Sequence, residues 1–251
     1  SVYPEYARDT FTGYEAFPRL PDHGIDVTRA IEVIGSRRPS IVVLTSPNNP
    51  TGTALLAPDL RAIASAALAV GAMVIVDEAY AEFRHDGVPS ACELLDEYPN
   101  LVVTRTMSKA FSLAGARLGY AVAADPRVVD ALRVVRLPYH LSAVTQAVAL
   151  TALQYADDLQ AQVALLRIER DALAAWLVER GFDVAASDAN FILFGTFDDR
   201  SAVWQSLLDD GVLVRETGPP GWLRVSIGTP EENAMFRRAL DGATRPTREE
   251  D

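Results

Sequence analysis

Three short, uninterrupted apolar runs do most to limit what this chain can fold into. Residues 41–45 (IVVLT), 72–76 (AMVIV) and 101–104 (LVVT) are rich in β-branched side chains, and polar residues follow each run. Runs of this kind are typical of strands in a parallel sheet, which are buried on both faces. Because helix-length segments separate them, the pattern predicts a βαβ sheet with helices on both sides.

The segments around these runs complete the predicted large domain. Residues 58–70 have a helical composition, and Pro58 suits a first helical turn, where the N–H that proline lacks would be unpaired anyway. Residues 118–123 predict a fourth strand, and residues 126–137 predict a further helix. Two helical stretches rich in Ala, Leu and Val then fill residues 142–180, with a weak break near Asp157 and Asp158.

The sequence changes character after Gly181, where short patterns predict a second, smaller unit. Strands are predicted at residues 190–194, 212–215 and 223–227, and helices at residues 201–208 and 231–240. The predicted fold class is α/β: a mostly parallel sheet with helices on both faces, plus a small C-terminal α+β domain. The predicted boundaries are residues 1–145 for the large domain, 146–180 for the connecting helices and 181–251 for the small domain.

Charge and composition exclude several classes of partner. The 251 residues carry a net charge of −11, which leaves no basic face for nucleic acid or an anionic membrane, although a few arginines could bind small anions. Cys92 is the only cysteine and the three histidines are far apart, so neither a disulfide nor a metal site is expected. With no apolar span and no secretory signal in the sequence, a cytoplasmic setting is expected.

One basic residue differs from all the others. Of the 23 Lys and Arg residues, Lys109 alone is a lysine. Arginine keeps its proton in proteins, whereas a buried lysine can lose its proton and become a nucleophilic amine. Lys109 therefore has two interpretations: an amine that forms a Schiff base with a carbonyl compound, or an ordinary residue on a solvated surface.

Polar clusters follow the three apolar runs. They are residues 46–52 (SPNNPTG), 77–80 (DEAY) and 106–109 (TMSK). Ligands of open parallel sheets bind at the carboxyl ends of the strands, so the three clusters are expected to converge on one crevice. No G-x-G-x-x-G sequence follows a strand and no glycine directly precedes the lysine, so the usual NAD and ATP motifs are missing.

Together and in this order, the clusters resemble those of the fold-type I pyridoxal-phosphate-dependent aminotransferases. The resemblance rests on SPNNPTG, DEAY, and SKAF at residues 108–111 followed by GARLG at residues 115–119. Residues 134–139 (VVRLPY), 211–215 (GVLVR) and 223–228 (LRVSIG) narrow it to the histidinol-phosphate aminotransferases, over essentially the whole chain. The resemblance implies pyridoxal 5′-phosphate as cofactor.

The resemblance also implies a role for each motif residue. Lys109 would hold the cofactor as a Schiff base and then move the substrate proton. Asp77 would pair with the pyridine nitrogen and keep it protonated, which makes the ring an electron sink. Asn49 and Tyr80 would hydrogen-bond the phenolic oxygen of the ring. The cofactor phosphate would be held by Thr106, Ser108 and Arg117.

The substrate is expected to bind through arginine. Arg224 resembles the substrate anion clamp of the family, Asn49 would also face the substrate, and Arg215 on the preceding strand could be a second arm. Two arginines suit a phosphate-bearing substrate, whereas one suffices for a carboxylate.

Several residues also have simpler explanations. Asp77 could cap a helix, Asn49 could serve only a turn, and Arg215 could be a surface residue of a strand. Glu78 is expected to face a helix or solvent. The clustered Tyr3, Tyr6 and Tyr14 are expected in the core or at an interface rather than at a ligand.

The resemblance begins late in the family's pattern. In the family, a preceding segment supplies a glycine-rich turn for the cofactor phosphate, an aromatic ring stacked on the pyridine, and a tyrosine that crosses to the partner subunit. These features have no counterpart in the sequence, which starts at Ser1 without methionine. We therefore expect a fragment that, on its own, binds the cofactor poorly and turns over little.

The expected activity is transamination of histidinol phosphate with 2-oxoglutarate, in histidine biosynthesis. Its partners are a small-molecule amino donor and a 2-oxo acid, and the family is generally homodimeric. The alternatives are an aromatic amino acid aminotransferase, a lyase similar to threonine-phosphate decarboxylase, and an inactive fragment that keeps the fold.

Overall fold

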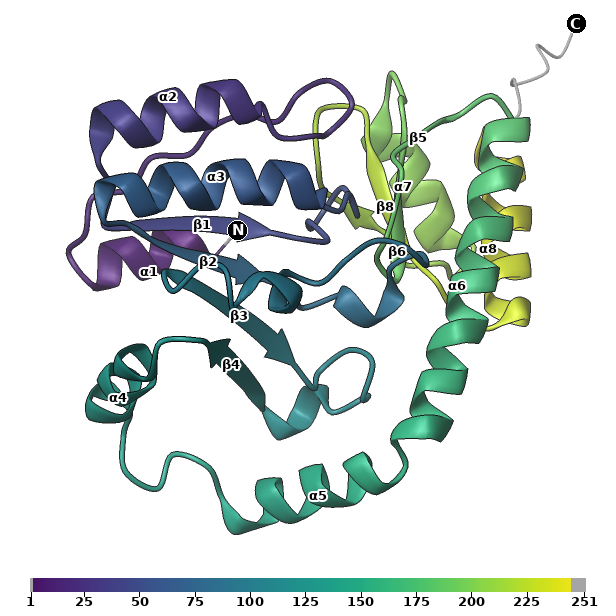
Figure 1. The fold of residues 1–251 in the computed structure, drawn as a ribbon. Coiled ribbons are helices and arrows are strands. Elements are labelled where there is room, and N and C mark those ends of the chain that lie inside the picture. Colours follow the sequence, from purple (N-terminus) through teal and green to yellow (C-terminus); the bar gives the residue numbers. More distant parts are fainter. Residues whose placement is uncertain (1, 245–251) are drawn as a thin grey trace, which may run out of the picture.

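The first sheet brings three strand ends to one edge. In the computed structural model, which describes residues 2–244, β1 (Ile41–Thr45), β2 (Met73–Asp77) and β3 (Leu101–Thr106) are parallel neighbours. β4 (Gly119–Ala123) runs antiparallel to β3 at the edge of the sheet (Figure 1). Because β1, β2 and β3 point the same way, their carboxyl ends meet as predicted, and the fourth strand is also confirmed.

Helices cover the two faces of this sheet unequally. α2 (Val27–Arg37) and α3 (Ala57–Val70) lie over one face, and α1 (Tyr3–Asp9) lies on the opposite side (Figure 1). Val74 and Val76 on the α3 side are fully buried, whereas Ile41 and Val43 are 52% and 39% exposed. β1 is therefore buried on one face only, unlike a strand in the middle of a fully covered parallel sheet.

The connection between β2 and β3 also differs from its prediction. Instead of a long helix it contains two short 3₁₀ turns, η1 (Ala81–Phe83) and η2 (Ala91–Leu94). The carboxylate of Glu78, 1% exposed, organises this segment by pairing with Arg105 at 2.6 Å and accepting hydrogen bonds from Ser90 Oγ and the Ala91 amide. Glu78 therefore faces the start of the 3₁₀ helix η2, in agreement with the expectation of a helix, and it is buried away from solvent.

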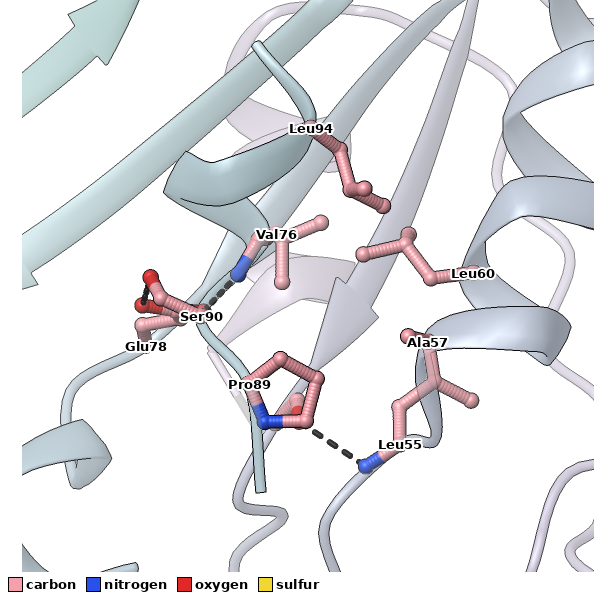
Figure 2. A pocket seen from close by; sticks show the side chains of 10 residues that line it. Leu55, Ala57, Leu60, Val76, Glu78, Pro89, Ser90 and Leu94 are labelled. Carbon is pink, nitrogen blue, oxygen red and sulfur yellow. Dashed lines mark hydrogen bonds between the residues drawn. The ribbon is translucent and has the colours of Figure 1, made fainter. Parts of the chain in front are cut away.

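A small cavity behind this connection is part of the core and not a ligand site. Figure 2 shows Leu60, Val76 and Leu94 pointing into it, with Glu78 and Ser90 at one side. Its volume is about 10 Å³, which is room for about one water molecule. The buried face of β2 thus carries no space for a substrate here.

A chain of helices leads to the second sheet. α4 (Pro126–Val135) and α5 (Ala143–Gln154) are followed by the long α6 (Ala156–Glu179). The break between α5 and α6 falls at Tyr155, two residues before the predicted position. The predicted helices of this region are therefore confirmed.

The second sheet is small and antiparallel, with strand order β5-β6-β8-β7. Its strands are β5 (Asp183–Val184), β6 (Phe191–Gly195), β7 (Arg215–Glu216) and β8 (Leu223–Ser226), flanked by α7 (Arg200–Asp209) and α8 (Pro230–Ala243). Of the predicted strand at 212–215, only Arg215 belongs to a strand, β7. Val214 packs into the core, and pairing with β8 begins at Arg215. β5, α1 and α2 were not predicted. The domain boundaries remain predictions, and Ser1 and residues 245–251 lie outside the described residues.

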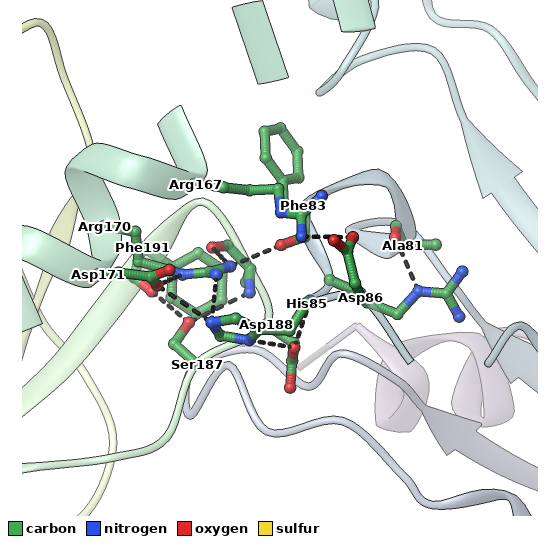
Figure 3. A network of polar contacts seen from close by, with 12 residues as sticks. Ala81, Phe83, His85, Asp86, Arg167, Arg170, Asp171, Ser187, Asp188 and Phe191 are labelled. Carbon is green, nitrogen blue, oxygen red and sulfur yellow. Dashed lines mark hydrogen bonds and ion pairs between the residues drawn. The ribbon is translucent and has the colours of Figure 1, made fainter. Parts of the chain in front are cut away.

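A buried arginine on α6 joins the second sheet to the first. Arg170 is 1% exposed, and its guanidinium donates to the carbonyl oxygens of Phe83 at 2.6 Å and Ala189 at 3.3 Å. The same group lies 2.8 Å from His85 Nε2 and donates to Asp171 at 2.9 Å (Figure 3). Phe83 and His85 belong to the β2–β3 connection and Ala189 precedes β6, so one charged group hydrogen-bonds to both parts of the chain.

A second contact lies beside it. The carboxylate of Asp188 accepts hydrogen bonds from the His85 amide at 2.9 Å and lies 2.8 Å from His85 Nδ1, while the Asp188 amide donates to the Gly52 carbonyl at 2.8 Å. Gly52 has φ +79°, and a Cβ atom there would lie 2.2 Å from Ser187 Oγ and 3.0 Å from Ser187 Cα. The loop after β1 and the segment before β6 can approach so closely only because residue 52 has no side chain.

We expect Gly52→Ala to lower the free energy of unfolding by roughly 2–4 kcal/mol, because it combines left-handed backbone strain with overpacking. The matched control is Gly71→Ala. Gly71 has nearly the same φ, +78°, but a Cβ atom there would meet nothing within 4 Å. That variant isolates the backbone cost of roughly 1 kcal/mol. Urea unfolding of both variants measures the difference, and equal losses would contradict a tight Gly52–Ser187 contact.

Candidate active site

The predicted site residues lie on three neighbouring loops at one edge of the first sheet. Residues 46–52 follow β1, residues 77–80 follow β2 and residues 106–109 follow β3. Thr45 pairs with Asp77, and Asp77 pairs with Thr104, so the three loops start at nearly the same level. This register is what brings residues from distant parts of the sequence together.

Asp77 presents a hydrogen-bonded carboxylate at the end of β2. Its Oδ1 accepts from the Ala79 amide at 3.1 Å, and its Oδ2 accepts from the hydroxyl of Tyr3. Burial raises the pKa of Tyr3, and the hydrogen bond to Asp77 and its negative charge raise it further. Tyr3 therefore remains a proton donor to Asp77 well into the alkaline range. The contact with Ala79 is a local turn bond, and no helix of eight or more residues within 2–244 begins here for Asp77 to cap.

Asn49 connects the two sheets. Its amide nitrogen donates to the Tyr80 hydroxyl at 3.3 Å, and its amide oxygen accepts from Arg224 Nη1 on β8. Burial raises the pKa of Tyr80, although the Asn49 hydrogen bond and the Arg224 charge act in the opposite direction. Because the Tyr80 hydroxyl accepts from Asn49, its own proton remains available to another acceptor. Asn49 therefore does more than shape a turn.

Lys109 lies on the loop after β3. The Met107 amide donates to the Leu118 carbonyl at 3.1 Å and the Leu113 amide donates to the Met107 carbonyl at 3.0 Å, which closes the loop on itself. The Lys109 side chain is exposed, and its Nζ lies 5.6 Å from the centroid of the Tyr80 ring. The amine thus stands beside Tyr80 with access to solvent.

The three predicted phosphate-binding residues occupy the same loop. Thr106 Oγ1 accepts from the Ser108 amide at 3.1 Å and lies 3.4 Å from the Leu118 carbonyl oxygen. Arg117 is exposed, has φ +52°, and donates to the Ala114 carbonyl at 2.9 Å. Thr106, Ser108 and Arg117 therefore all lie on the loop that carries Lys109. The Arg117 guanidinium is turned toward the backbone of its own turn.

The two arginines predicted to bind substrate are cross-strand partners. Arg215 on β7 pairs directly with Arg224 on β8, so both side chains project from the same face of the small sheet. Arg215 is exposed, and Arg224 is half-buried. Burial lowers the pKa of Arg224, although Tyr80 acts in the opposite direction, and the positive charge of Arg215 lowers it further. Two adjacent cations of this kind attract an anion.

Two residues at the site escaped sequence reasoning. Tyr3 was expected in the core or at an interface, yet its hydroxyl contacts Asp77 from 74 residues away. Phe191, predicted only as part of a strand, packs edge-to-face on Tyr80 with centroids 5.1 Å apart. For Tyr3, the only sequence feature that set it apart was its place in the cluster of early tyrosines. For Phe191, no sequence feature indicated a position at the site.

A larger cavity opens beside Asn49. It measures about 630 Å³ and is lined by residues 18–21, His23, residues 48–51, Gly218, Pro219 and Trp222. Within residues 2–244 no group of His, Cys, Asp and Glu side chains is arranged to hold a metal ion. None of the helices in that part of the chain has both the length and the apolar character needed to cross a bilayer.

The family model for aminotransferase class I and II matches residues 4–240. The chain belongs to this family. Expectations from sequence about the fold class are thereby confirmed, with the corrections described above.

Individual relatives carry a more specific name. The chain is 62% identical to histidinol-phosphate aminotransferase from Thermobifida fusca and 55% identical to histidinol-phosphate aminotransferase 3 from Burkholderia lata. These alignments cover 97% and 95% of this chain but only 65% and 64% of the two relatives. The chain therefore spans less than two thirds of the length of these relatives.

A solved structure supports the fold. Histidinol-phosphate aminotransferase from Sinorhizobium meliloti, in complex with pyridoxal 5′-phosphate, is 25% identical with a TM-score of 0.85. The match covers 96% of this chain and 67% of that one. The sheets described here are thus arranged as in that enzyme.

The Tyr3–Asp77 contact predicts a pH-dependent stability. The folded protein keeps the Tyr3 proton above pH ~10, where an unfolded tyrosine loses it, so stability is full below pH ~10 and falls as pH rises further. Tyr3→Phe should cost about 1 kcal/mol at pH 8 through the lost hydrogen bond. Above pH ~10 its stability should fall less steeply than that of the parent, by up to ~1.4 kcal/mol per pH unit.

Urea unfolding between pH 8 and 11 measures this slope. Tyr6→Phe is the control, because Tyr6 lies one helical turn away and is 60% exposed. The interpretation fails if Tyr3→Phe keeps the slope of the parent, or if Tyr6→Phe changes it equally.

Proposed function

We propose that this chain is part of a pyridoxal-phosphate-dependent aminotransferase that acts on histidinol phosphate, with 2-oxoglutarate as amino acceptor. The observation that carries the proposal is the position of Lys109 beside Tyr80, at the strand edge that also holds Asp77 and Asn49. The names of the 62% and 55% identical relatives support the substrate.

The donor set fits pyridoxal 5′-phosphate. An ionised carboxylate can accept about four hydrogen bonds, so Asp77 keeps capacity for a pyridinium N–H beside its bonds from Tyr3 and Ala79. Tyr80, with its proton free to donate, suits a phenolic oxygen. Thr106, Ser108 and Arg117 offer two hydroxyls and a guanidinium for phosphate. When bound, the cofactor supplies an electron sink for the carbanion that transamination requires.

The residues of the chain divide the remaining work. Lys109 is the amine that attaches the cofactor and then takes and returns the proton at the substrate carbon. Asp77 would keep a positive charge on the ring nitrogen of the bound cofactor, and Tyr3 holds the orientation of that carboxylate. Arg224 holds the anionic end of the substrate, with Asn49 setting the position of its guanidinium.

Arg215 is the reason to favour a phosphate-bearing substrate. A carboxylate needs one guanidinium, whereas a phosphate dianion is better matched by two. The direct pairing of Arg215 with Arg224 supplies the second. The whole protein is further proposed to be a cytoplasmic homodimer, as is general in the family.

Lys109→Arg should abolish transamination in the whole protein, because arginine keeps the charge but cannot form a Schiff base. The direct measurement is borohydride reduction in the presence of pyridoxal phosphate, followed by peptide mass analysis. We expect the cofactor mass on the peptide that contains Lys109 and none in the variant.

The same experiment on this 251-residue chain tests the expectation that it binds the cofactor poorly. Weak labelling of the chain beside strong labelling of the whole protein would agree with that expectation. Retained transamination in Lys109→Arg would overturn the proposed function, and carbon dioxide release from threonine phosphate would identify a lyase instead.

Arg215 and Arg224 predict a split between substrates. Arg224→Ala should weaken the binding of every anionic substrate by a factor on the order of 100, because a desolvated charged contact is lost. Arg215→Ala should raise KM for histidinol phosphate on the order of tenfold while leaving phenylalanine nearly unchanged. Steady-state kinetics with both amino donors measure this. Equal losses for both donors in Arg215→Ala would remove the argument for a phosphate-bearing substrate.

A further inference from the structure

Four side chains at the site form a closed ring of contacts between the two sheets. Asn49 bonds to Tyr80 and to Arg224, as described above. On the other side, Phe191 packs on Tyr80 with ring centroids 5.1 Å apart, and the guanidinium carbon of Arg224 lies 4.7 Å from the centroid of the Phe191 ring. Phe191 is the one apolar member of the ring, and it is 2% exposed.

Arg224 depends on this aromatic contact because few polar partners hold it. Its Nε is buried and has no hydrogen-bond partner within residues 2–244, and Asn49 binds only Nη1. A desolvated guanidinium over an aromatic face is stabilised by the ring quadrupole. The Phe191 ring therefore offsets part of the cost of half-burying this cation, and it limits where the guanidinium can lie.

Phe191 is itself held firmly. Its carbonyl oxygen accepts a hydrogen bond from Ser187 Oγ at 2.6 Å, and its backbone pairs with Ser226 in the small sheet. Ser187 packs against Gly52 in the loop that also carries Asn49. The aromatic ring of Phe191 is thus fixed relative to both Tyr80 and Arg224, which it contacts.

We propose that Phe191 is a positioning residue, which holds the Arg224 guanidinium in the orientation that binds the anionic end of the substrate. The inference rests on the proposed function for the identity of that anion. It assigns to Phe191 no contact with the reacting atoms. Its effect is exerted on substrate affinity through Arg224.

The test compares two phenylalanines on the same strand. Phe191→Leu removes the aromatic face but keeps an apolar side chain, and Phe194→Leu makes the same change three residues along β6. Phe194 is 0% exposed and packs against Phe182, Phe197 and Phe236 in the core of the small sheet. Both variants should lose stability, but only Phe191→Leu should change the position of the Arg224 guanidinium.

In the whole protein, Phe191→Leu should raise KM for histidinol phosphate on the order of tenfold with kcat nearly unchanged, as expected for a lost cation–π contact that acts on binding. Phe194→Leu should leave KM near that of the parent. Phe191→Tyr keeps the aromatic face, so its KM should return most of the way from the Phe191→Leu value to the parent value. Equal KM changes in the two leucine variants, or none in Phe191→Leu, would overturn the proposal.

A spectroscopic arm keeps the two proposals distinguishable. In ¹H–¹⁵N spectra, the Arg224 Nε–H signal should shift in Phe191→Leu, because the ring current is lost, and stay in place in Phe194→Leu. If the parent has no transaminase activity, the proposed function fails while this shift still decides the role of Phe191. An Arg224 signal that does not move in Phe191→Leu would refute that role.

Discussion

The position of the small sheet on the large one depends on the burial of one charged side chain. Arg170 is almost fully inaccessible, and the carbonyl oxygens of Phe83 and Ala189 accept its hydrogen bonds from opposite sides of the junction. Leaving a buried charge without partners costs about 3–5 kcal/mol, so each carbonyl is held where the guanidinium can reach it. Asp188, bonded to His85 and to Gly52, extends the same junction toward the loop after β1.

The contacts that join Arg224 to the rest of the candidate site depend on this junction. Asn49 and Tyr80 come from the first sheet, whereas Arg224 and Phe191 come from the second, and the contacts among them cross the gap that Arg170 bridges. A change in the angle between the sheets would therefore separate Asn49 from Arg224 before it disturbed either sheet. Under the proposed function, affinity for the anionic end of the substrate is thus coupled to the relative position of the sheets through the two ends of the Asn49 amide.

The sequence predicted the features that depend on local pattern. The strands at residues 41–45, 72–76 and 101–104 were found because continuous β-branched runs are distinctive, and the loops after them were found because each strand ends in polar residues. The connection after Glu78 is long enough for a helix, and a helix was expected there. Instead, the buried ion pair between Glu78 and Arg105 holds this segment in a non-helical course. Tyr3 was missed for the same reason: its hydroxyl meets Asp77 through tertiary packing that no spacing records.

The arginine-rich composition gains its meaning from these contacts. Where only a fixed charge is required, as in the buried Arg170 and in the Glu78–Arg105 pair, the chain uses a group that cannot lose its proton. Lys109 stands instead on an exposed loop, 5.6 Å from the Tyr80 ring, where no carboxylate pairs with it among the ion pairs of residues 2–244. An accessible amine beside Tyr80 can carry out covalent chemistry that a guanidinium cannot, and this chemical difference separates the only lysine from the arginines around it.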